Sequence, residues 1–373
     1  MEFGPVAARD SAGLIAAHTV RAEGTTLRKG RPIPAEAAQR LAESCHPPIV
    51  AVRLDPGDVG EDEAAARLAG ALGGEGLAPQ AAFTGRCNLV AQAAGLFLVE
   101  PALIDAVNAV DEAITVATLP AFRPVAAGEM VATIKIIPYA VAGAPLERAC
   151  AAAPRPPMRL APYRLTRIGV VSTLLPGLKP AIVTKTLRVL ADRLAPTGAG
   201  IVSESRVPHA AGAVAEALAR AAAEGAELVV VFGASAIADR RDVIPAGLEA
   251  AGGRVEQFGM PVDPGNLLLL GQLGSLPVIG APGCARSAKE NGFDFVLHRL
   301  LAGLSVTRAD IVRLGVGGLL SEIALRGQPR AGADGPGQEV RQEARQESGQ
   351  ETGQETGQEL GEELGQEAGH DAA

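Results

Sequence analysis

The sequence predicts an α/β fold whose main domain, residues 166–303, is a doubly wound, mostly parallel sheet. From Arg167 onward, short continuous apolar runs alternate with amphipathic stretches. This is typical of parallel strands that are covered by helices on both faces. The composition, 47% hydrophobic with 3% aromatic residues and no Trp, favours a core of Ala, Val, Leu and Ile in which helices pack closely on the sheet.

The elements of this domain follow in order from the apolar runs and the stretches between them. The predicted strands are residues 168–173, 200–203, 228–232, 255–258 and 277–280; the predicted helices are 180–194, 210–224, one after Asp242, and about 286–302. In such sheets ligands bind beyond the carboxyl ends of the strands. The loops at those ends are therefore where we expect a site.

Residues 1–150 predict an α+β accessory domain of irregular topology. Its expected strands are 49–52 and 131–138, and its expected helices 61–72 and 101–118. A Pro-rich strap, residues 151–165, follows, because its four prolines remove amide donors and forbid a continuous helix. Residues 304–330 are expected to extend the main domain.

Residues 331–373 predict a disordered tail that repeats Gly-Gln-Glu. The repeat places a Gly in each helical turn and Glu at i and i+4, which destabilises a helix. This tail holds 11 acids and 2 bases, a net charge of −9, so the total of −8 leaves residues 1–330 near +1. Either a solvated linker or a docking segment fits this composition.

Composition also excludes several classes of protein. Two Tyr and eight Phe scattered through apolar runs supply no stacking platform in a basic groove, so we expect no nucleic-acid partner. Four separated cysteines without a Cys-x-x-Cys pair argue against a disulfide framework or a zinc site. No apolar run approaches 18 residues, so we expect a soluble, cytoplasmic chain without a membrane contact.

Three loops contain the candidate site residues, although each loop by itself is an ordinary connection between a strand and a helix of an α/β domain. The first, residues 233–243, follows an apolar strand with small residues that let backbone amides approach a phosphate. Its candidate binding residues are Gly233, Ala234 and Ser235. Asp242 in the same loop is placed either to hold a ligand or simply to cap the next helix.

The second loop, residues 259–266, contains a Pro-Gly pair that fixes the direction of the chain. Its candidate binding residues are Asp263, Pro264, Gly265 and Asn266. The third loop, residues 280–287, is a glycine-rich turn that we expect to enter a helix N-terminus, where an anion can bind. Its candidate binding residues are Gly280, Pro282, Gly283 and Cys284.

In this order and spacing, the three loops resemble the molybdopterin-binding domain shared by molybdopterin adenylyltransferases and molybdopterin molybdotransferases. The matching motifs are Gly233-Ala234 through Arg241-Asp242-Val243, then Pro264-Gly265, then the run from Pro277 through Gly280 to Pro282-Gly283. The resemblance covers residues 166–303, with weaker similarity to molybdotransferases near Asp10 and Lys29. Proteins that fuse this domain to a cytidylyltransferase are a further resemblance.

The sequence departs from the family pattern at several positions. Thr173-Leu174-Leu175-Pro176 stands where the family carries Thr-Gly-Asp-Glu, and the loop Ser205–His209 lacks the acids usual there. Ala234, Asn266 and Cys284 replace Gly, Lys and Asn. These changes put a catalytic role in doubt.

The resemblance implies a molybdopterin-binding protein of molybdenum cofactor biosynthesis, in one of two forms. One is an enzyme of nucleotidyl transfer or metal insertion, with Mg²⁺ held by Asp242 and with Asp242 and Asp239 as catalytic candidates. The other is a non-catalytic carrier that presents the pterin or its nucleotide to a partner nucleotidyltransferase or molybdoenzyme. A homo-oligomer is expected by resemblance alone.

Overall fold

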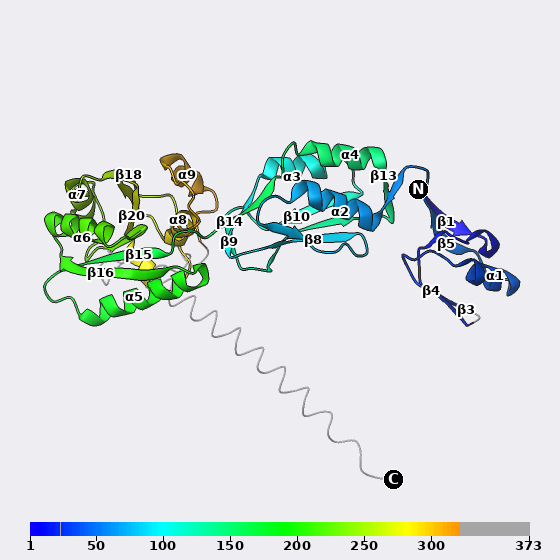
Figure 1. Ribbon diagram of the computed structural model, residues 1–373, viewed down its shortest axis with the longest axis horizontal. Coiled ribbons are helices and arrows are strands. Elements are labelled where there is room, and N and C mark those ends of the chain that lie inside the picture. Colours follow the sequence, from blue (N-terminus) through cyan, green and yellow to red (C-terminus); the bar gives the residue numbers. More distant parts are fainter. Residues whose placement is uncertain (23, 321–373) are drawn as a thin grey trace, which may run out of the picture. The chain divides into compact units, whose positions relative to one another are not determined.

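The computed structural model describes residues 1–22 and 24–320 (Figure 1). Its main domain is built on a six-stranded sheet with the strand order β16-β15-β17-β20-β19-β18. The strands are β15 (Arg167–Leu174), β16 (Gly200–Pro208), β17 (Leu228–Phe232), β18 (Arg254–Phe258), β19 (Leu269–Leu273) and β20 (Leu276–Ala281). β16, β15, β17 and β20 pair in parallel. The α/β class with a mostly parallel sheet is thus confirmed.

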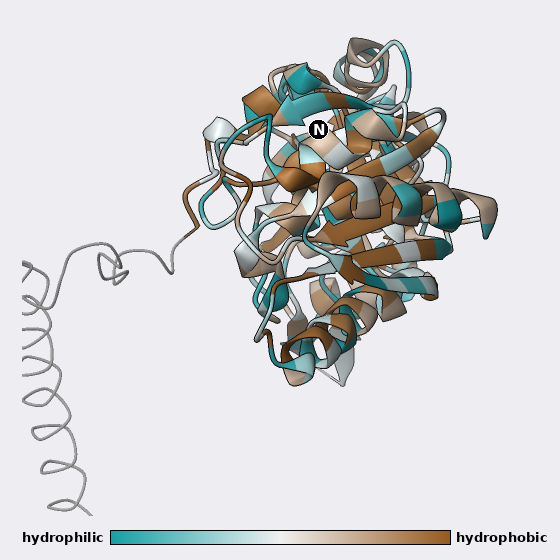
Figure 2. Ribbon diagram, turned by 90° about the vertical axis from the view of Figure 1, so that its left-hand side faces the viewer, coloured by the Kyte–Doolittle hydropathy of each residue, from teal (hydrophilic) through white to brown (hydrophobic). Residues whose placement is uncertain are grey.

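Helices cover both faces of this sheet, as expected for a doubly wound domain. They are α5 (Pro180–Leu194), α6 (Ala211–Ala223), α7 (Val243–Ala250), α8 (Gly292–Leu301) and the short α9 (Arg308–Val312). One set of strand side chains, including Val171, Val229 and Val231, joins the buried cluster of α6 and α7. The residues between them face the other way, where the α5 and α8 side of the domain lies. Figure 2 shows the apolar strands as brown ribbons.

The prediction for this domain missed one strand and misplaced two boundaries. β19 was not predicted; it runs antiparallel between β20 and β18. β16 continues to Pro208 through residues predicted to be a loop, because an edge strand alternates exposed with partly buried side chains and so has no continuous apolar run. α8 begins at Gly292, not near 286, because residues 283–286 form a 3-10 turn (η3) and Asn291 caps the helix.

Two of the hydrophobic clusters formed by the described residues lie entirely within the first 162 residues. Residues between Ala8 and Ala51 form the first, around α1 (Ala35–Glu43). Its strands are β1 (Glu2–Val6), β2 (Ile15–Ala16), β3 (Val20–Ala22), β4 (Thr25–Leu27) and β5 (Ile49–Arg53). Residues between Ala64 and Leu160 form the second. The structure of residues 1–150 thus has the irregular α+β character that the sequence predicts.

The second cluster is enclosed by short antiparallel strands and three helices. The helices are α2 (Glu61–Leu72), α3 (Pro101–Asn108) and α4 (Gly143–Ala152); the strands are β6 (Asp58–Gly60), β7 (Leu77–Pro79), β8 (Arg86–Ala91), β9 (Gly95–Val99), β10 (Ile114–Thr118), β11 (Arg123–Val125), β12 (Met130–Ile136), β13 (Ala140–Ala142) and β14 (Met158–Pro162). The predictions of α2 and of strands at 49–52 and 131–138 are confirmed to within two residues at each end.

The predicted helix 101–118 was wrong in its second half. α3 ends at Asn108, and β10 pairs with β12 over Ile114–Thr118. Pairing with a neighbouring strand overrode the helical pattern there. The predicted strap also contains regular structure, since β14 pairs with β9 in the accessory half. The predicted tail, 331–373, and residues 321–330 of the predicted extension lie outside the described residues. No helix within the described part of the chain is long and apolar enough to span a membrane.

Candidate functional site

The three predicted loops meet at one edge of the sheet. β18 is antiparallel to β19, which is antiparallel to β20, so β18 points the same way as β20, β17 and β15. Loops after the carboxyl ends of these strands therefore lie along a single edge. A side-chain contact joins the third loop to the first, and backbone contacts join the second loop to the start of α8.

Arg286 joins the first and third loops. Its guanidinium donates to the Gly233 carbonyl (2.7 Å) and to Thr186 Oγ1 of α5 (3.0 Å). It also lies over the Phe232 ring, 5.3 Å from the centroid. Burial lowers the pKa of Arg286 from its ordinary value. Among the described residues, this half-buried cation has no carboxylate partner.

A glycine pair joins the second loop to the start of α8. Gly265 has φ +143°, and a Cβ there would lie 2.9 Å from the Gly292 Cα. The Gly292 amide donates to the Pro264 carbonyl at 2.8 Å. Only glycine permits this backbone conformation and this close approach, which explains why the Pro-Gly turn is needed here.

A chain of hydrogen bonds crosses the ends of β15, β16 and β17. The Ala234 amide donates to Thr173 Oγ1 (2.8 Å). Thr173 Oγ1 lies 2.8 Å from His209 Nδ1, and His209 Nε2 lies 2.9 Å from Ser235 Oγ. Thr173 is buried, His209 half-buried and Ser235 exposed. The chain of bonds thus links the ends of three neighbouring strands.

The first loop also presents backbone donors. The amides of Ser235, Ala236 and Ile237 have no acceptor within the described residues. Ser172, which pairs in register with Phe232, has a buried hydroxyl that likewise lacks a partner there. The edge of the sheet around Arg286 thus offers backbone amides, a hydroxyl and a cation, which is the chemistry of an anion site.

The two predicted catalytic acids are engaged within their own loop. Asp242 Oδ2 accepts from the amides of Ala238 (2.6 Å) and Asp239 (3.1 Å). Asp242 occupies the N-cap position of α7 but accepts no helical amide. Arg241 donates to Asp239 Oδ1 at 2.7 Å and holds the pKa of Asp239 at about 2. In the described part of the chain, no three His, Cys, Asp or Glu side chains gather as a metal site.

The helix that follows the third loop does not offer the free N-terminus expected from the sequence. Asn291 accepts from the Phe293 amide, and Asp294 accepts from the Asn291 amide at 2.8 Å, which makes a capping box. Together with the Gly292 bond to Pro264, these contacts use the amides of the first turn. An anion is therefore better served by the first loop and Arg286.

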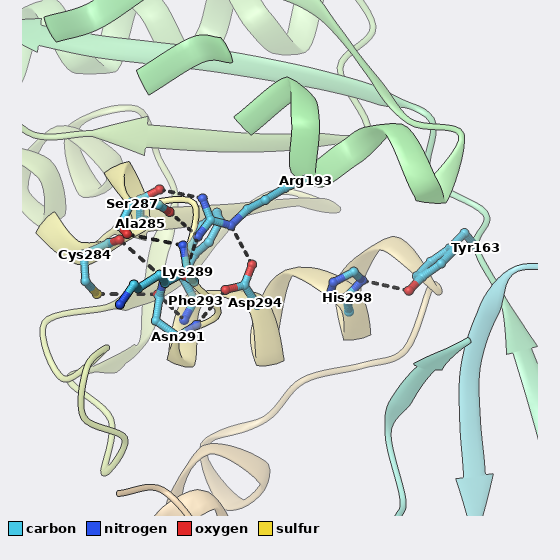
Figure 3. A network of polar contacts seen from close by, with 10 residues as sticks. All are labelled: Tyr163, Arg193, Cys284, Ala285, Ser287, Lys289, Asn291, Phe293, Asp294 and His298. Atoms are coloured by element: carbon cyan, nitrogen blue, oxygen red, sulfur yellow. Dashed lines mark hydrogen bonds and ion pairs between the residues drawn. The ribbon is translucent and has the colours of Figure 1, made fainter. Parts of the chain in front are cut away.

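The remaining predicted residues have different surroundings. Cys284 lies in η3, half-buried, with its Sγ 3.5 Å from Asn291 Oδ1 (Figure 3). The Asp263 amide donates to the Gly318 carbonyl, and the Asn266 carbonyl accepts from Met260. Gly280 is a packing position, since a Cβ there would lie 2.7 Å from Ile237 Cδ1, whereas Gly283 faces open space.

Sequence reasoning missed Arg286, Thr173 and His209 as site residues. A polar residue at the end of an otherwise apolar strand was the available signal for Thr173. Arg286 sits five residues beyond β20, in the loop that was singled out, but its burial depends on Thr186 of a distant helix.

The main domain is similar to a known family of proteins. Residues 170–302 match the family described as "probable molybdopterin binding domain". Among solved structures, a molybdopterin biosynthesis MoeA protein from Pyrococcus horikosii is 16% identical, with a TM-score of 0.29 over 57% of this chain and 68% of that one. MogA is 19% identical, with a TM-score of 0.27 over 36% of this chain and 94% of that one. No curated protein matches the chain. The similarity to a known family therefore rests on the match of residues 170–302.

Proposed function

We propose that this chain, whose residues 170–302 match the molybdopterin-binding domain family, binds molybdopterin at the carboxyl edge of its six-stranded sheet. The loops after β17, β18 and β20 form the cradle. In this role the chain takes part in making or handing on the molybdenum cofactor.

The observation that carries the proposal is the surroundings of Arg286. A half-buried guanidinium that lacks a carboxylate partner among the described residues is costly unless an anion neutralises it. Molybdopterin brings a phosphate, and a forked guanidinium suits phosphate oxygens. The unengaged amides of Ser235, Ala236 and Ile237 supply further donors in the adjoining loop.

When bound, molybdopterin supplies the phosphate that the cradle recognises and the dithiolene sulfurs that hold the metal. The chain's own residues bind and orient it. Arg286 holds the phosphate, while the glycine pair Gly265 and Gly292 keeps the second loop close to α8. Cys284, half-buried in the third loop, is the residue with the chemistry to face the sulfur end.

Anaerobic calorimetry with isolated molybdopterin tests the proposal. We expect a dissociation constant of about 1 µM or tighter for the full chain. Arg286→Met should weaken binding at least about tenfold, and Arg286→Lys should recover part of the loss. The control is Arg148→Met, an exposed arginine of α4, which should bind as the wild type does. Absence of binding by the wild-type chain would overturn the proposal.

Two forms of this function remain: catalysis of nucleotidyl transfer or metal insertion with Mg²⁺, and carriage of the cofactor to a partner nucleotidyltransferase or molybdoenzyme. The hydrogen bonds of Asp242 and Asp239 within the first loop favour carriage, because both carboxylates already have partners. Turnover of bound molybdopterin with Mg-ATP or Mg-CTP separates them. Nucleotidylated product would establish an enzyme; binding without product in either assay favours the carrier.

A further inference from the structure

Three polar side chains at the ends of β15, β16 and β17 form a directed hydrogen-bond relay that reaches Ser235 in the proposed cradle. We propose that Thr173 is a positioning residue that holds His209 as the neutral Nε2–H tautomer. His209 in this form is in turn a positioning residue for Ser235, because it leaves the Ser235 hydroxyl able to donate to a phosphate-type anion. The last step rests on the proposed function, whereas the tautomer does not.

The direction of the relay is fixed at its buried end. Thr173 is 2% exposed, and its Oγ1 already accepts from the Ala234 amide. A hydroxyl has one hydrogen to donate, and a buried one without an acceptor is unfavourable. Among the described residues, the only acceptor within hydrogen-bond distance of Thr173 Oγ1 is His209 Nδ1, at 2.8 Å. Thr173 therefore donates to His209 Nδ1.

The direction of the bond between His209 and Ser235 follows from the neutral imidazole, in which one nitrogen donates and the other accepts. With Nδ1 accepting, the ring proton is on Nε2. His209 Nε2 then donates to Ser235 Oγ, 2.9 Å away. Since Ser235 Oγ is the acceptor in that bond, its own hydrogen points elsewhere. Ser235 is exposed and begins the run of unengaged amides, so its hydroxyl is placed to donate to the same anion.

This polarity is the reverse of that in a serine nucleophile. There, the histidine nitrogen facing the hydroxyl accepts its proton. Here the facing nitrogen already carries a proton and cannot act as a base toward Ser235. Ser235 and His209 are thereby assigned to anion binding. Acyl transfer at Ser235 is excluded, because His209 Nε2 donates to the Ser235 hydroxyl and cannot accept its proton.

Nitrogen NMR of the full chain, ¹⁵N-labelled at histidine, reads the tautomer without any ligand. The chain has five histidines, so His209 is assigned by the signal missing from His209→Gln. At about pH 9, where histidine side chains are neutral, we expect the Nε2–H form of His209 in about tenfold excess or more. Thr173→Val should reduce this excess toward the ratio of a free imidazole, and Thr173→Ser should restore it. A predominant Nδ1–H form, or an unchanged spectrum in Thr173→Val, would overturn the relay.

Two ligand measurements test the role of Ser235. Titration with inorganic phosphate should give about tenfold weaker binding for Ser235→Ala than for the wild type. Ser44→Ala, which removes a hydroxyl at the end of α1, should have no effect. Equal phosphate affinity in Ser235→Ala and wild type, or labelling of Ser235 by a fluorophosphonate, would overturn the donor role. Failure of molybdopterin to bind while the Nε2–H form persists would overturn the proposed function and leave the relay intact.

Discussion

Arg193 and Asp294 form a buried ion pair that fixes the third loop. Arg193 Nε donates to Asp294 Oδ1 at 2.7 Å, and each side chain is 8% exposed. The same guanidinium donates to the carbonyls of Ala285, Ser287 and Lys289 (Figure 3). One residue of α5 thus holds both the loop after β20 and the capping acid of α8.

Arg193→Met should lower the free energy of unfolding by about 3–5 kcal/mol, because it leaves a buried carboxylate without its partner. Denaturant unfolding measures this. The double variant Arg193→Met/Asp294→Asn should recover part of the loss, since the unpaired charge is then gone. An unfolding midpoint like that of the wild type in Arg193→Met would contradict a stabilising role for the pair.

Gly265→Ala should destabilise the domain by about 1–3 kcal/mol, because the positive φ and the approach to Gly292 leave no room for a Cβ. Molybdopterin affinity should fall in parallel, as the second loop shifts. The matched control is Gly283→Ala in the third loop, where a Cβ meets nothing within 4 Å. Thermal unfolding compares the two, and equal melting temperatures would show that the glycine contact is dispensable.

Substitutions of Asp242 distinguish closure of the first loop from Mg²⁺ binding. If its carboxylate only closes the first loop, Asp242→Asn keeps an oxygen for the amides of Ala238 and Asp239 and should retain pterin affinity, whereas Asp242→Ala should lose about tenfold. If it also holds Mg²⁺, both variants should weaken any Mg²⁺-dependent nucleotidyl transfer. Equal affinity in all three proteins would remove Asp242 from the cradle.

Glu227 should make stability depend on pH in the acidic range. Its carboxylate accepts from the amides of Thr166 and Arg167 at the start of β15, which lowers its pKa. A lowered pKa in the folded state stabilises the protein above the ordinary glutamate pKa, and this contribution is lost as pH falls through the lowered value.

Glu227→Gln should therefore be less stable than the wild type near pH 7, by about 1 kcal/mol because the site is partly solvated. The difference should shrink in acid, as the wild-type carboxyl becomes protonated. Urea unfolding at several pH values measures it. A difference that stays constant down to the acid limit would mean that the lost amide contacts, and not the charge, set the effect.

Much of the main domain could be predicted from local sequence. Strands buried on both faces, such as Leu228–Phe232, are continuous apolar runs, and the helix Pro180–Leu194 has a clear period and a proline at its first turn. Two strands were harder to predict: β16, at one edge, is partly exposed, and β19 runs antiparallel to its neighbours. Their pairing depends on neighbours that are distant in sequence.

Of the candidate site, the sequence by itself determined three loops, their order and the small residues that shape them, because turns and strand ends are encoded locally. The tertiary structure alone decided which side chains meet there. It brought Thr173, His209 and Ser235 from three strand ends into one relay, buried Arg286 beside Thr186, and engaged Asp239 and Asp242 within their own loop. Such contacts depend on burial and on hydrogen-bond partners many residues away, which no local pattern specifies.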